Sequence, residues 1–180
     1  NGLAANHAVT VSSVDASTSG NVVLTGTAGS GTRTYTLVDT NNGSIDISAA
    51  NGNLVLGVVT AGTGGTANTV AVTATAGAID DEASDATADI IGSTLTLSAS
   101  SGIGQTNGSV DVNVTTLTSA ASATGGIALN LLNDVVSANG LAANHAVTVS
   151  SVDASTSGNV VLTGTAGSGT RTYTLVDTNN

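Results

Sequence analysis

The chain has 180 residues, with twelve acidic residues against two arginines, and carries a net charge of −10 at pH 7. It contains no cysteine, which excludes a disulfide framework and a thiolate metal site, and two cations can neutralise too few phosphates for nucleic-acid binding. No run of residues has the pattern of a membrane span or a signal peptide. The abundance of Val, Thr, Ser, Ala, Gly and Asn is typical of strands and turns.

A long internal repeat organises the chain. Residues 1–42 recur without a change at residues 139–180, an offset of 138 residues. Residues 1–42 are therefore the C-terminal third of one 138-residue repeat, and residues 43–180 are one full period. We expect an excerpt of a longer tandem array that forms a continuous solenoid without linkers.

A shorter, degenerate repeat lies inside the long one. Four segments share the form apolar–x–apolar–Ser/Thr–Ala/Gly–x–x–Gly, at Val22–Gly29, Ile45–Gly52, Val70–Gly77 and Leu95–Gly102. Alternation with a period of two predicts strands with one buried face, and each glycine is expected where the chain turns. The predicted inward residues are Val22, Leu24, Ile45, Ile47, Val70, Val72, Leu95 and Leu97.

A strand that recurs about every 23 residues can satisfy its backbone hydrogen bonds if the chain coils, so that each strand pairs with those of the neighbouring coils. The sequence therefore predicts an all-β fold, a parallel β-helix (β-solenoid) of about six coils per 138-residue repeat. Further strands at 109–114, 127–131, 146–152 and 171–176 would form the other faces of each coil. At ~4.8 Å per coil, the two identical segments should be related by a translation of ~29 Å and a modest twist.

The alternative fold is a string of tandem cadherin-like or Ig-like β-sandwiches. Residues 35–56 read as a cadherin-like hairpin, and 138 residues could hold one such domain. That fold would leave the evenly spaced glycines unexplained, and the sequence has no tryptophan or cysteine pair for its core.

One acidic segment is the candidate metal site. Its carboxylates could supply the oxygen ligands that Ca²⁺ requires, although the spacing is not that of an EF-hand. The other interpretation, which we favour, is a solvated loop that bulges between two coils. The candidate calcium ligands are Asp80, Asp81, Glu82, Asp85 and Asp89.

Catalytic constellations are missing from the sequence, so we expect neither an enzyme nor any cofactor other than calcium. His7 and its copy His145 have no second histidine or cysteine at ligand spacing, and there is no Gly-x-Ser-x-Gly nucleophile motif. Each period offers only one arginine and one tyrosine for binding a sugar. Arg171 is expected on an exposed face, beside carboxylates.

The stretch 92–134, GSTLTLSASSGIGQTNGSVDVNVTTLTSAASATGGIALNLLND, resembles the repeat region of filamentous-haemagglutinin-type adhesins. The openings Gly77-Ala-Ile-Asp-Asp and Gly43-Ser-Ile-Asp-Ile are similar to the Gly-x-Ile openings of that family. The resemblance implies a right-handed parallel β-helix that forms an exported stalk or fibre on the bacterial surface.

Together, these observations favour a non-catalytic, structural or adhesive repeat segment of an extracellular bacterial fibre or giant surface adhesin. Its expected partners are neighbouring copies of the same repeat and a host or cell-surface receptor or glycan, with no nucleic acid and no membrane insertion. The alternative function is a calcium-dependent cell-surface adhesin built of β-sandwich repeats.

Overall fold

The computed structural model describes residues 6–62, 68–85, 87–132, 146–154, 159–164 and 169–178. These residues form strands and turns without any helix, so the described part holds no helix that could cross a membrane. The sixteen strands are β1 (Val9–Val11), β2 (Val14–Ala16), β3 (Val22–Gly26), β4 (Arg33–Thr40), β5 (Ile45–Ala49), β6 (Leu54–Ala61), β7 (Thr69–Ala74), β8 (Ile79–Asp81), β9 (Ile90–Ala99), β10 (Val110–Ser122), β11 (Ile127–Leu132), β12 (Val147–Val149), β13 (Val152–Ala154), β14 (Val160–Thr163), β15 (Arg171–Tyr173) and β16 (Val176–Asp177).

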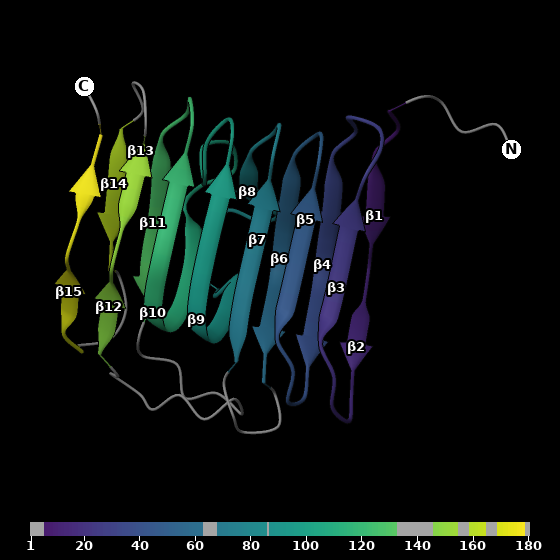
Figure 1. The fold of residues 1–180 in the computed structure, drawn as a ribbon, viewed down its shortest axis with the longest axis horizontal. Coiled ribbons are helices and arrows are strands. Elements are labelled where there is room, and N and C mark those ends of the chain that lie inside the picture. Colours follow the sequence, from purple (N-terminus) through teal and green to yellow (C-terminus); the bar gives the residue numbers. More distant parts are fainter. Residues whose placement is uncertain are drawn as a thin grey trace, which may run out of the picture.

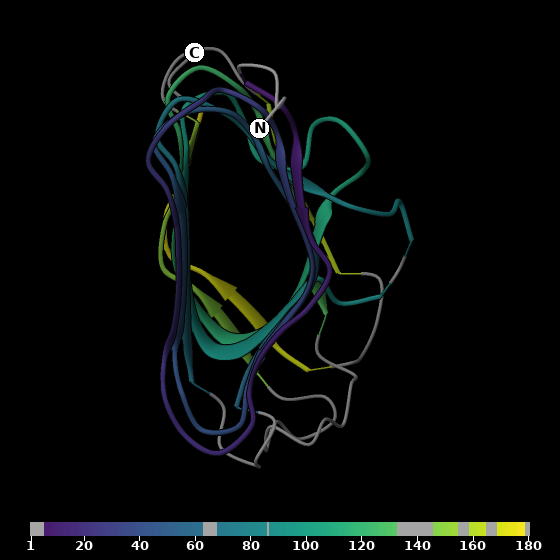
Figure 2. The same cartoon turned by 90° about the vertical axis from the view of Figure 1, so that its right-hand side faces the viewer.

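The strands stack in parallel as a β-solenoid of about six turns, which confirms the predicted fold rather than the sandwich alternative. Figures 1 and 2 show two walls around one interior. We call the nearer wall in Figure 1 the front wall; it holds β3, β5, β7, the second halves of β9 and β10, and β12, β13, β15 and β16. The back wall holds β1, β2, β4, β6, β8, the first halves of β9 and β10, and β11 and β14.

The predicted inward residues form the core. Val22, Ile45, Val70 and Leu95 lie in one column because each strand pairs in register with the strand above it. Seven of the eight predicted residues are buried, and Leu24 is partly buried against the same cluster. Burying one large aliphatic side chain contributes ~1.5–3 kcal/mol, so each turn can hold its neighbours through a few such residues.

Glycines mark corners where successive coils come into close contact. Gly52 has a φ of +82°, which favours glycine, and it follows the end of β5. One coil further on, a Cβ at Gly77 would overlap the carbonyl oxygen of Gly52. Because the recurring glycine has no side chain, the backbones of successive coils can approach each other closely at this corner.

We expect Gly77→Val to destabilise the fold, because the new side chain must push two backbones apart. The predicted loss is about 2–3 kcal/mol, the range for overpacking a site that cannot relax freely. Urea unfolding followed by circular dichroism measures it, with Ala76→Val as the control, since Ala76 is exposed. Equal midpoints for the two variants would contradict this account of the corner.

The two identical segments lie on opposite walls, so the predicted simple translation is wrong. β1 pairs with β4 on the back wall, whereas their copies β12 and β15 pair on the front wall, in the same register. Similarly, β3 belongs to the front wall and its copy β14 to the back wall. The 138-residue offset covers eleven passages from wall to wall, or five and a half turns, so the copies are related by a half-turn and a rise of ~26 Å.

The surroundings of Arg171 also differ from expectation, and those of its copy Arg33 are similar in kind. Arg33 is 9% exposed, and its guanidinium donates hydrogen bonds to the carbonyl oxygens of Asn51 and Ala28, both at 2.6 Å. Its copy Arg171 is partly buried, and its Nε and Nη2 donate to the carbonyl of Leu131. Both arginines therefore bind backbone carbonyls, and Arg171 is partly buried rather than on the exposed face that was predicted.

Candidate functional site

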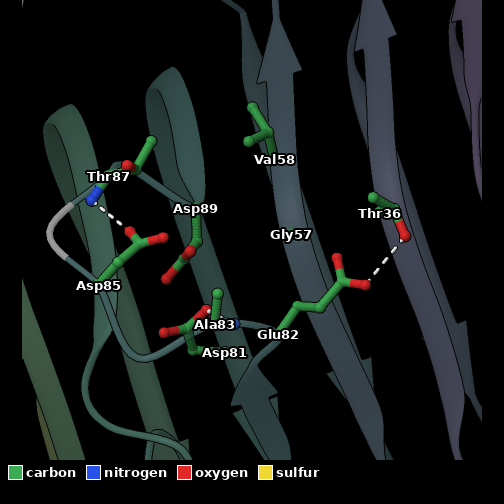
Figure 3. Close-up of a pocket in the computed structure, with 9 residues that line it drawn as sticks. All are labelled: Thr36, Gly57, Val58, Asp81, Glu82, Ala83, Asp85, Thr87 and Asp89. Carbon is green, nitrogen blue, oxygen red and sulfur yellow. Dashed lines mark hydrogen bonds between the residues drawn. The ribbon is translucent and has the colours of Figure 1, made fainter.

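The acidic segment leaves the back wall between β8 and β9. Residues 54–56 of β6 pair with β8, and residues 59–60 pair with the start of β9, so residues 82–89 are an insertion within one turn. The insertion frames a shallow hollow over the outer side of β6 (Figure 3). Four of the five predicted calcium ligands line this hollow, namely Asp81, Glu82, Asp85 and Asp89, whereas Asp80 does not.

Of the five predicted ligands, Asp80, Asp81, Asp85 and Asp89 accept hydrogen bonds from backbone amides. Asp81 accepts from Ala83 N at 2.8 Å and Asp85 from Thr87 N at 2.6 Å, which shapes the insertion. Asp80 accepts from the amides of Gln105 and Thr106 in the next coil, both at 3.1 Å. The carboxylates thus have structural partners within and between coils.

Glu82 reaches across a whole coil. Its Oε1 accepts a hydrogen bond of 3.0 Å from the hydroxyl of Thr36 on β4, and β6 lies between the two (Figure 3). The path crosses β6 at Gly57, where an added Cβ would collide with the Glu82 carboxylate and the Thr36 carbonyl. Glycine at this position therefore opens the floor of the hollow.

A row of polar residues continues from Asp89 across the next coils on the outer side of the back wall. We call it the polar ladder; it consists of Asp89, Asp111, Asn130 and Thr163. Asp89 accepts a hydrogen bond of 2.7 Å from Asp111 N, and Thr163 Oγ1 lies 3.4 Å from Asn130 Oδ1. Asp89 and Asp111 are only 5% and 1% exposed, so two carboxyl groups lie buried in adjacent coils.

Burial dominates the electrostatics of this site. It raises the pKa of Asp89 to about 9, and the nearby charges of Asp81 and Asp111 act in the same direction. Burial likewise raises the pKa of Asp81 and that of Asp111. With its pKa raised to about 9, Asp89 is protonated at neutral pH.

Sequence reasoning missed Asp111, Asn113 and Asn130. They alternate with core valines and leucines and so face away from the core, yet all three are buried, and Asn113 is fully buried. Asp111 Oδ1 and both polar atoms of the Asn113 side chain lack a hydrogen-bond partner in the described structure. The only sequence signal for them was the presence of Asp or Asn within predicted strands, because strands usually avoid these two residues.

Within the described residues, no three acidic or histidine side chains form a group that could hold a metal ion. The hollow is acidic, but its carboxylates accept amide and hydroxyl hydrogen bonds instead of converging on one point. His7 is described and exposed, whereas His145 lies outside the described residues.

We expect EDTA to leave the thermal midpoint of the protein unchanged, because its contacts hold the acidic insertion without an ion. Calorimetry with and without EDTA, followed by addition of Ca²⁺, measures this. A midpoint that rises with Ca²⁺, and no longer rises in Asp85→Asn, would instead establish the predicted calcium site.

No family model, curated protein or solved structure matches this chain.

Proposed function

We propose that the chain is a non-catalytic, structural or adhesive repeat segment of an extracellular bacterial fibre or giant surface adhesin. The observation that carries this proposal is the placement of two identical segments at the two ends of one continuous β-solenoid. A solenoid stabilised by contacts between neighbouring turns can be lengthened by adding repeats, so repetition supplies length. The family resemblance of residues 92–134 supports the same function.

The strong negative charge favours fibres that stay apart in solution and disfavours binding to nucleic acid. A net charge of −10 makes neighbouring fibres repel each other, an effect that fades beyond ~8 Å at physiological salt. Outside the chain itself, the proposed partner is a receptor or glycan on a host or cell surface. The solenoid fold does not support the alternative function, a calcium-dependent adhesin built of β-sandwich repeats.

Two experiments test this function. Chains of one, two and three periods should be rods whose length, measured by small-angle scattering, grows by ~26 Å per period. Antibodies against the repeat should label the surface of intact source cells. Compact particles of several periods, or labelling only after lysis, would contradict the proposal, and turnover of a polysaccharide by the purified chain would indicate an enzyme.

A further inference from the structure

The two identical segments expose opposite sides. Residues 9–40 are covered on one side by β5 and β6, and no described strand pairs with their other side. In the second segment, β12 and β13 are covered by β10 and β14 by β11, and here the side that would meet β5 and β6 has no described strand partner. Each end of the described solenoid is therefore an open edge. The strands that would cover this edge are the ones that cover the same sequence in the other copy.

The exposed fractions of matched residues quantify these two edges. Tyr35 and Val38 are 5% and 0% exposed beneath β6, whereas their copies Tyr173 and Val176 are 43% and 44% exposed. The opposite holds at the other end, where Val9 is 40% exposed and its copy Val147, covered by β10, is 1% exposed. The open ends thus carry apolar side chains that the same sequence buries elsewhere.

We propose that the C-terminal edge, formed by β14, β15 and β16, is the docking surface for the strands equivalent to β5 and β6 of a following copy of the repeat, and that each copy adds with a half-turn. This inference rests on the proposed fibre function. The register is set by the first copy: Val160 would pair with the next Ile45, as Val22 does, and Arg171 with the next Leu54, as Arg33 does.

The second segment lies on the opposite walls from the first. The strands that dock on it must therefore also lie on the walls opposite to those of β5 and β6. The following β5 joins the back wall and the following β6 joins the front wall. The structural period of the fibre is therefore two sequence repeats, or eleven coils and ~53 Å. The acidic hollow and polar ladder then alternate between the two sides of the fibre, one every ~26 Å.

Spin labels test the half-turn in the chain as it stands, since it contains no cysteine of its own. Thr25 and Asp153 lie in one column of the front wall through Ser48, Thr73, Ser98 and Ala121, five coils or ~24 Å apart. The copy of Thr25, Thr163, lies on the back wall. Double electron–electron resonance should give a shorter distance for Thr25→Cys/Asp153→Cys than for Thr25→Cys/Thr163→Cys. A simple translation would reverse this order and overturn the half-turn.

Tyrosine nitration tests the docking surface. In the chain as it stands, tetranitromethane should modify Tyr173 and spare Tyr35, with Tyr35→Phe and Tyr173→Phe assigning the product. Appending a second copy of residues 43–180 should protect Tyr173, so that again only the last tyrosine reacts. Nitration of Tyr173 in the extended chain would overturn the proposal. Neither readout depends on cellular location or adhesion. A failure of the docking proposal can therefore be distinguished from a failure of the proposed function.

Discussion

Replacing Asp89 with Asn should stabilise the protein at pH 8 by several kcal/mol. Burial raises the pKa of Asp89 to about 9, well above the ordinary value of 3.8. The folded chain therefore keeps a proton that the unfolded chain has released, so the contribution of Asp89 to stability is most favourable below about pH 4 and is lost as the pH rises toward 9. The slope for one such proton is about 1.4 kcal/mol per pH unit. An Asn side chain avoids this cost and can still accept the hydrogen bond from Asp111 N.

Urea unfolding at pH 5 and pH 8 measures the effect, because ordinary carboxylates do not titrate between these values. The parent protein should lose stability over this interval, and Asp89→Asn should lose much less. Asp46→Asn is the matched control, since Asp46 is an exposed aspartate of β5. A parent protein whose stability is the same at both pH values would contradict the burial of Asp89.

Removing the ring of Tyr35 should cost about 3 kcal/mol, the usual loss for truncating a buried aromatic side chain. Tyr35 is 5% exposed and belongs to the core cluster. Its copy has the same neighbours in sequence, but Tyr173 is 43% exposed at the open edge. Tyr173→Ala should therefore cost no more than about 0.5 kcal/mol, as most exposed substitutions do.

Comparing the two variants by chemical denaturation separates the effect of a residue's position along the solenoid from the effect of its local sequence. Tyr35→Phe and Tyr173→Phe serve as controls that keep the ring. Equal losses for the two alanine variants would mean that the two copies have equivalent surroundings, which contradicts the open edge.

The core and the turns could be predicted from the sequence because both depend on local pattern. Val22, Ile45, Val70 and Leu95 recur at nearly constant spacing, and this spacing alone places them in one column of a parallel stack. The glycine at the end of each unit likewise predicts a corner of the coil. The positive φ of Gly52 confirms this prediction.

The half-turn and the polar ladder could not be predicted in this way. The alternating pattern of Val9 and Val11 fits either wall, so only the number of wall crossings in 138 residues decides where the copy falls. Asp89 and Asp111 become neighbours because the insertion before β9 sets the register, and loop lengths of this kind are not encoded by periodicity. Arg171 was expected on an exposed face because charge usually lies there, yet its guanidinium donates to the Leu131 carbonyl. At the buried copy Arg33, nearby glycines give the guanidinium room among carbonyls.

The parallel pairing of every described strand also determines how such a fibre responds to load. The hydrogen bonds between coils run along the fibre axis, so a pull on its two ends stretches them directly instead of shearing them. Coils at an end would then peel away one row at a time, each releasing about 25 residues of slack chain. In the proposed fibre, a long array would lengthen under modest tension and recoil when the tension is removed.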